Sequence, residues 1–205
     1  VIPLQLVPLS KYIDKLKESE LLFEKDNEAL GLFYSKEFVE MSTKLEHLLV
    51  GGKHVLLPGL TGNGRRSVVK YISYILGFEY KTFYLTSQPY NFSSFKRDLK
   101  KLLEYVGVND KRVVLFLEDH HFKEHNNMDL INTFLASGDF PDVIKTEEIE
   151  QSLGKDSLEE LKKSYMSNNT YECFLRRIKN NLKVVVSLNH SSSEFLSIIS
   201  SNPSL

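Results

Sequence analysis

The sequence predicts an α/β fold, a parallel sheet of four strands flanked by helices. Short apolar runs alternate along the chain with segments whose apolar residues recur at helical spacing, and this alternation is typical of parallel sheets. The run Val113 to Leu117 is apolar at every position, which indicates a central strand covered on both faces. A glycine-rich turn at 58–67 separates a strand pattern from a helix pattern, as in phosphate-binding loops.

The composition is that of a protein with a sizeable hydrophobic core. The chain has 205 residues, 41% of them hydrophobic, and a net charge of -1, which allows one large domain or a domain with an appendage. It has no run of basic residues and no apolar run of membrane-spanning length, so we expect no nucleic-acid and no membrane partner. The single cysteine, Cys173, excludes an internal disulfide and fits a reducing compartment. Because the first residue is Val1 rather than Met, we expect a piece of a longer polypeptide.

The first part of the chain divides into two predicted units. Residues 1–34 form a lead-in segment that is extended up to Pro8 and then helical to about residue 23, with Ser10 as its cap. Residues 35–205 form the α/β domain. Its first helix runs from about 35 to 49, with Ser35 as the cap and glycines at 51 and 52 as the end.

The remaining elements follow in alternation. After a first strand at 53–57, we expect further strands at 80–85, 113–117 and 184–186. Expected helices lie at 68–76, from Asn91 or Ser93 to about 106, and at 128–135, 171–178 and 193–199. Glycines at 77, 107 and 138 are predicted to end three of these helices. Residues 142–168 are polar and lack a long apolar stripe, so short, exposed and mobile helices are expected there.

The glycine-rich turn is the first half of a candidate site. Its glycines let backbone N–H groups surround an anion, and the following helix directs its positive end toward that anion. In the full P-loop pattern, G-x-x-x-x-G-K-[ST], Arg65 stands at the lysine position and Arg66 at the magnesium-binding hydroxyl position, while Ser67 comes one residue late. The alternative is an ordinary turn between a strand and a helix. The candidate phosphate-binding residues are Pro58, Gly59, Leu60, Thr61, Gly62, Asn63, Gly64, Arg65, Arg66 and Ser67.

Polar residues at two strand ends form the second half. Ligands of parallel sheets bind at the carboxyl ends of strands, where Glu118, Asp119 and Asn189 would meet the loop. In P-loop ATPases one acidic residue holds magnesium and the next polarises water, so these three are candidate catalytic residues and Glu118 is the candidate Mg²⁺ ligand. The usual order is Asp then Glu, and the reversed order favours binding with slow or no hydrolysis. The alternatives are acidic residues that simply end a strand and, for Asn189, a turn residue.

Three histidines, His120, His121 and His125, follow the acidic pair. They could suggest a metal site, but no cysteine cluster or repeated ligand spacing accompanies them. A loop of solvated histidines is the favoured interpretation.

Several short motifs follow one another from about Phe38 onward. They are the glycine-rich loop at 59–67 and the segments 90–100, 131–132, 137–141, 177–182 and 202–205. In their order and spacing, these motifs resemble the large subdomain of the fourth AAA+ module of a dynein heavy chain. Some of them, Leu117-Glu118-Asp119 included, look most like the cytoplasmic dynein of intraflagellar transport.

The resemblance implies a P-loop AAA+ sheet with the first strand beside the fourth, then the third, then the second; the family's fifth strand and helical lid would lie beyond Leu205. It also implies ADP or ATP as cofactor, with Mg²⁺ possible, neighbouring AAA+ modules as partners, and microtubules as partner of the intact motor. The expected function is nucleotide binding that regulates a minus-end-directed motor of the cytoplasm, cytoskeleton and cilium, with weak or no hydrolysis. The alternatives are a structural spacer of the motor ring that binds no nucleotide, and a self-contained P-loop NTPase or kinase.

Overall fold

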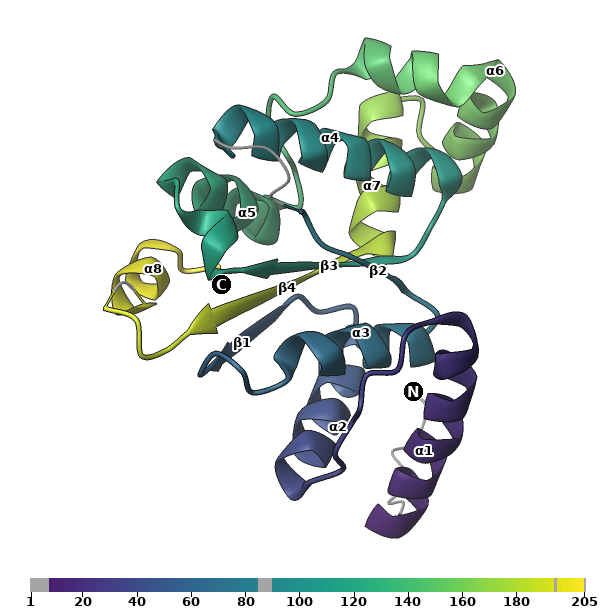
Figure 1. Cartoon of the computed structure of the whole chain (residues 1–205). Coiled ribbons are helices and arrows are strands. Elements are labelled where there is room, and N and C mark those ends of the chain that lie inside the picture. The colour runs from purple at the N-terminus through teal and green to yellow at the C-terminus, as the bar shows by residue number, and fades with distance from the viewer. Residues whose placement is uncertain (1–7, 85–89, 194, 205) are drawn as a thin grey trace.

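The computed structural model of the chain describes residues 8–84, 90–193 and 195–204. Helices and strands alternate along them, and the helices pack on both faces of one sheet (Figure 1). The strands are β1 (Val55–Gly59), β2 (Glu79–Lys81), β3 (Val113–Glu118) and β4 (Leu182–Asn189). The helices are α1 (Leu9–Asp26), α2 (Lys36–Val50), α3 (Arg65–Ile75), α4 (Phe92–Asn109), α5 (His125–Ser137), α6 (Thr146–Tyr165), α7 (Thr170–Asn181), α8 (Phe195–Ser201) and the short 3-10 helix η1 (Asp119–Phe122).

The sheet has the order β1-β4-β3-β2, and every pairing is parallel. This is the order that the resemblance implies, and the predicted α/β class is confirmed. The register places Gly59 opposite Asn189 and Glu118 opposite Ser187. The carboxyl ends of β1, β4 and β3 therefore meet at one edge of the sheet, where both halves of the candidate site are expected.

The continuous apolar run of β3 is explained by burial on both faces of the sheet. Val113, Leu115 and Leu117 face one core, whereas Val114 and Phe116 face the other, and all five side chains are fully buried. Successive side chains of a strand point to opposite faces, so a central strand needs apolar residues at every position. The first core lies under α4 to α7, and the second lies under α1 to α3 (Figure 1).

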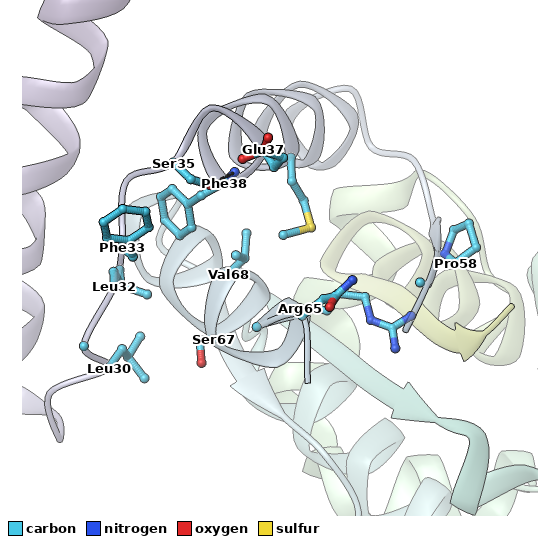
Figure 2. Close-up of a pocket in the computed structure, with 15 residues that line it drawn as sticks. Leu30, Leu32, Phe33, Ser35, Glu37, Phe38, Pro58, Arg65, Ser67 and Val68 are labelled. Atoms are coloured by element: carbon cyan, nitrogen blue, oxygen red, sulfur yellow. Dashed lines mark hydrogen bonds between the residues drawn. The ribbon is translucent and has the colours of Figure 1, made fainter. Parts of the chain in front are cut away.

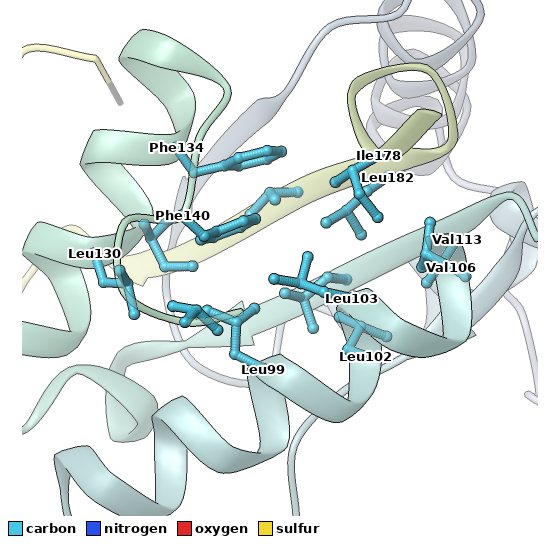
Figure 3. Close-up of a cluster of buried hydrophobic side chains, with 14 of the residues drawn as sticks. Leu99, Leu102, Leu103, Val106, Val113, Leu130, Phe134, Phe140, Ile178 and Leu182 are labelled. Atoms are coloured by element: carbon cyan, nitrogen blue, oxygen red, sulfur yellow. The ribbon is translucent and has the colours of Figure 1, made fainter. Parts of the chain in front are cut away.

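The first core, which is the larger of the two, packs α4 to α7 against the sheet. In Figure 3, Leu99 and Leu103 of α4 point toward the strands, and the rings of Phe134 and Phe140 stack with centroids 4.1 Å apart. Burying each such side chain contributes about 1.5–3 kcal/mol. This packing fixes the position of β3, and with it the acidic residues at its end.

Helix α1 packs on the smaller core. Leu16 and Phe23 are almost fully buried, and the ring of Phe23 meets the rings of Tyr71 and Tyr74 edge-on. The Tyr71 hydroxyl donates a hydrogen bond to the Leu16 carbonyl oxygen. The division of the chain at residues 34 and 35 stays a prediction, but α1 shares the core of α2 and α3.

Helix caps agree with the sequence at two positions and differ at one. Ser35 accepts a hydrogen bond from the Phe38 N–H, at 3.2 Å, and Asn91 caps α4. The prediction that Ser10 caps the first helix is wrong, because α1 already begins at Leu9. Pro8 precedes it, and a proline loses no hydrogen bond at a helix start.

The predicted helix end at Gly107 is also wrong. Helix α4 continues to Asn109, and Gly107 is buried within it. A β-carbon at position 107 would lie 2.1 Å from a ring carbon of Phe174. The glycine therefore allows α4 and α7 to approach, whereas Gly77 and Gly138 do end helices, with left-handed φ values of +70° and +73°.

Residues 142–168 are less exposed than predicted. Helix α6 spans most of this segment and bends at Gly154, where φ is +71°. It buries Ile149, Leu153 and Leu161 against the larger core. These are the buried residues of a 20-residue helix, so apolar residues are too sparse in this segment to form a continuous stripe in the sequence.

Element boundaries shift by a few residues elsewhere. Strand β1 extends through Pro58 and Gly59, β4 is longer than predicted, and α3 and α5 begin earlier. Strand β2 ends at Lys81, before the predicted end; the last predicted residue, Leu85, lies outside the described residues. The predicted start of the last helix adjoins residue 194, also outside them. None of the described helices is both long and apolar enough to cross a membrane.

Candidate functional site

The glycine-rich segment connects β1 to α3 at the carboxyl edge of the sheet. Pro58 and Gly59 are the last residues of β1, and Arg65 is the first residue of α3. Gly62 and Gly64 have φ values of +91° and +67°, which residues with a β-carbon adopt only with strain. Gly64 is the N-cap of α3, so the N–H groups of the first helical turn, which lack partners within the helix, adjoin the loop, as an anion site requires.

Two cavities adjoin this loop, and both are of ligand size. The smaller, of about 450 Å³, lies between the loop segment 61–66 and the β3 end at 118–120. The larger, of about 660 Å³, lies between the loop and the segment 30–38 (Figure 2). Both cavities are lined by Asn63, Gly64 and Arg65. The loop thus forms a shared wall, with the acidic residues on one side and an apolar surface on the other.

The larger cavity includes residues that the sequence did not assign to the site. Leu30 and Leu32 line it opposite Val68 of α3, and Phe38 and Met41 of α2 complete the apolar wall. These residues suit an aromatic or otherwise apolar group. The signal in the sequence was the pair of leucines two residues apart, just before the helix cap.

Arg65 occupies the lysine position of the P-loop pattern, and its side chain turns back onto the sheet. One terminal nitrogen, Nη1, donates to the carbonyl oxygens of Leu57 and Leu188, both at 2.8 Å. The other, Nη2, contacts the Leu60 carbonyl oxygen at 3.3 Å. Gly59 leaves room for this path, since a β-carbon there would lie 3.2 Å from Nη1. Arg65 therefore joins the ends of β1 and β4, with its guanidinium already hydrogen-bonded.

Arg66 stands at the hydroxyl position and forms an ion pair with Glu118 across the smaller cavity. Its Nη2 donates to Oε2 of Glu118. The Arg66 side chain is 60% exposed and that of Glu118 is 22% exposed. Hydrogen bonding to Glu118 raises the pKa of Arg66, so the guanidinium stays charged. The buried hydroxyl of Tyr80 has no hydrogen-bond partner among the described residues. The charges of Arg66 and Glu118 act on this hydroxyl.

Asp119 and Asn189 contact each other, as the sheet order predicts, but through the backbone. Both carboxylate oxygens of Asp119 accept the Asn189 N–H, at 3.0 and 3.2 Å. The side-chain oxygen of Asn189 accepts the Ser191 N–H at 3.1 Å. The Asp119 carboxylate thus binds the last residue of β4, and the Asn189 side chain binds the turn that follows it.

His121 departs from the expectation of solvated histidines, which is wrong for this residue. Its side chain is buried, its Nδ1 accepts the Glu118 N–H at 2.9 Å, and its Nε2 lies 2.9 Å from the Phe83 carbonyl oxygen. Because Nδ1 is the acceptor, Nε2 carries the proton and donates to Phe83. Burial lowers the pKa of His121, which favours this neutral ring. The histidine joins the end of β3 to the segment after β2 and so holds Glu118 in place.

The residues at the magnesium position do not fit the ion. A P-loop magnesium site combines a loop hydroxyl, phosphate oxygens and a carboxylate. Here a guanidinium replaces the hydroxyl and binds the carboxylate of Glu118. A second cation would have to displace Arg66 from Glu118 against charge repulsion.

Comparison with known proteins agrees with this geometry. Residues 30–205 match the family described as the P-loop containing dynein motor region D4. The chain belongs to this family. The match covers the loop, the four strands of the sheet and the segment 30–33 that lines the larger cavity. The predicted family, the fourth module of a dynein heavy chain, is confirmed.

Curated relatives give the same family. The chain is 33% identical over 186 residues to cytoplasmic dynein 2 heavy chain 1 of Chlamydomonas reinhardtii, covering 89% of this chain. It is 30% identical over 196 residues to cytoplasmic dynein 2 heavy chain 1 of Homo sapiens, covering 94%. Identity to dynein axonemal heavy chain 10 of Homo sapiens is 27% over 169 residues, covering 81%. The chain spans about 4% of the length of each of these relatives.

Proposed function

We propose that this chain is a regulatory nucleotide-binding module of a dynein motor, with weak or no ATP hydrolysis of its own. The single observation that carries the proposal is the pairing of its polar groups. The charged groups at the lysine, hydroxyl, metal and water-polarising positions all make hydrogen bonds within the protein. The anion-binding geometry of the loop and α3 remains.

Binding is supported by the loop and its two cavities. Backbone N–H groups at the start of α3 attract phosphate irrespective of the side chains that replaced lysine and hydroxyl. The larger cavity offers an apolar wall next to that anion site, with Leu32 and Val68 on opposite sides. ADP or ATP combines an anionic chain with an aromatic base, and we propose these as the ligands.

Slow hydrolysis is expected because the carboxylate at the water-polarising position, Asp119, already accepts a hydrogen bond from the protein. A catalytic carboxylate must orient a water molecule within hydrogen-bond reach. In Asp119 both oxygens bind the Asn189 N–H, and this carboxylate is also one methylene shorter than the glutamate of the usual pattern. A misplacement of about 1 Å can cost roughly 100-fold in rate.

A regulatory role follows if nucleotide is bound but not turned over. Bound nucleotide changes the balance between conformations only through contacts that differ between them. Arg65 joins the ends of β1 and β4 beside the loop, so a ligand that shifts the loop would alter their junction. We propose that neighbouring AAA+ modules of the same heavy chain sense this change.

The wider setting is also a proposal, because the chain spans about 4% of its relatives. We propose a minus-end-directed motor of the intraflagellar-transport type, in the cytoplasm, on the cytoskeleton and in cilia. Microtubules would be partners of the intact motor and not of this chain.

Equilibrium binding of a fluorescent ADP analogue tests the proposal. Gly64→Ala and Gly52→Ala form a matched pair, because both glycines have left-handed φ values, +67° and +74°, and open space at the β-carbon position. We expect Gly64→Ala to weaken binding about tenfold and Gly52→Ala to leave it unchanged. Absence of ADP and ATP binding to the unmodified chain would support a structural spacer instead. Steady turnover of ATP would support a self-contained NTPase.

A further inference from the structure

The guanidinium of Arg66 lines the smaller cavity and places a positive charge there. Arg66 and Glu118 face each other across this cavity, which the loop glycines Gly62 and Gly64 also line. The two residues are 52 positions apart in the chain, so the fold, not local sequence, brings them together. Glu118 is the last residue of β3, and its N–H donates a hydrogen bond to Nδ1 of His121.

The guanidinium retains binding capacity after it has paired with Glu118. Arginine carries five N–H donors in a planar fork. The contact with Glu118 uses Nη2, and no other hydrogen bond of Arg66 is found among the described residues. Because its side chain is 60% exposed, the remaining donors are accessible from the cavity, where they can bind phosphate oxygens.

A guanidinium in this position supplies the positive charge that a metal ion otherwise supplies beside the phosphates. Guanidinium groups bind phosphate with charge-assisted hydrogen bonds. The same group also neutralises Glu118, which would otherwise repel a nucleotide. Magnesium would bring two further positive charges next to Arg66 and compete for the same carboxylate.

We propose that this site binds a nucleoside diphosphate or triphosphate without a divalent metal, with Arg66 bridging the phosphates and Glu118. The proposal rests on the proposed function, since it requires nucleotide to bind at the loop. It assigns Arg66 as the phosphate-binding cation of the site and Glu118 as its anchor.

The test is ADP affinity of the 205-residue chain, measured by calorimetry in magnesium and in excess EDTA. We expect the two dissociation constants of the unmodified chain to agree within about threefold. Arg66→Ser restores a hydroxyl and releases Glu118, so its affinity is expected to become about tenfold or more tighter in magnesium than in EDTA. Arg66→Lys keeps a cation and is expected to bind ADP more weakly, with the metal independence retained.

Arg176→Ser is the matched control. Arg176 is also an exposed arginine whose Nη2 contacts a glutamate, Glu172, but it lies on α7. We expect it to match the unmodified chain in both buffers, and circular dichroism checks that each variant is folded. A second measurement uses Mn²⁺ as a paramagnetic probe. Protein-bound Mn²⁺ is expected with ADP and Arg66→Ser, but not with ADP and the unmodified chain.

The outcomes separate the two proposals. Binding of ADP by the unmodified chain that is about tenfold or more tighter in magnesium than in EDTA would overturn the role of Arg66 while leaving the proposed function intact. Binding in neither buffer would overturn both. Binding in EDTA that Arg66→Ser leaves unchanged would also contradict the assignment of Arg66.

Discussion

Arg65→Lys separates a structural arginine from a phosphate-binding one. The guanidinium donates to the carbonyl oxygens of Leu57 and Leu188, both at 2.8 Å, and contacts that of Leu60. A hydrogen bond that involves a charged group contributes about 1.5–3 kcal/mol. A lysine has one nitrogen in place of the arginine fork. Because the site is only half-buried, we expect a loss of about 2 kcal/mol in the free energy of unfolding.

Urea unfolding measures this loss, and thermal unfolding should show a decrease of about 4–8 °C in Tm for a chain of this size. ADP affinity should increase in the same variant, because an ammonium at position 65 is less firmly held by the carbonyl oxygens and can turn to the phosphates. Arg97→Lys is the control, since this side chain is 59% exposed and pairs with its neighbour Asp98 at 3.7 Å. We expect Arg97→Lys to lower the free energy of unfolding by less than about 0.5 kcal/mol. Unchanged stability together with weaker ADP binding in Arg65→Lys would refute the reasoning and show that Arg65 serves the nucleotide.

Three further predictions concern the fold. Gly107→Ala places a β-carbon 2.1 Å from the Phe174 ring and should lower the free energy of urea unfolding by about 2 kcal/mol; adding Phe174→Leu should recover part of this. Burial lowers the pKa of His54 to about 4, so the unfolded chain binds more protons below about pH 6.5 and stability falls as the pH drops from there toward 4. His54→Gln should flatten that slope in urea titrations across the same pH range, whereas an unchanged slope would exclude His54 as its source. Asn91→Ala removes the cap of α4 and should lower the free energy of urea unfolding by about 1 kcal/mol, and an unchanged value would contradict this role of Asn91.

The fold was predictable where one principle decides the local structure. Strand β3 is recognisable in the sequence because both of its faces are buried, which requires apolar residues at successive positions. Ser35 and Asn91 were predictable as caps because their side-chain oxygens accept hydrogen bonds from backbone N–H groups of the first helical turn. The errors arise where a distant contact decides. Gly107 resembles a helix end in the sequence, but the ring of Phe174 requires it. Pro58 resembles a turn, yet an edge strand tolerates proline.

The site was predictable in position and not in its internal contacts. The sheet order brings the loop, Glu118 and Asn189 to one edge, as parallel topology demands. Nothing in the sequence shows that Arg65 turns back to backbone carbonyl oxygens or that His121 is buried beneath Glu118. Such contacts depend on side-chain directions that only the folded chain defines.

A single-turnover experiment tests the central claim most directly. The chain, in excess, is mixed with radiolabelled ATP, and the bound nucleotide is recovered by filtration and identified over time. The account predicts that ATP is retained by the protein and remains ATP long after an enzyme with a rate of about 1 per second would have converted it. Conversion of bound ATP to ADP on the order of once per second would contradict the account, because the groups needed for hydrolysis would then be available.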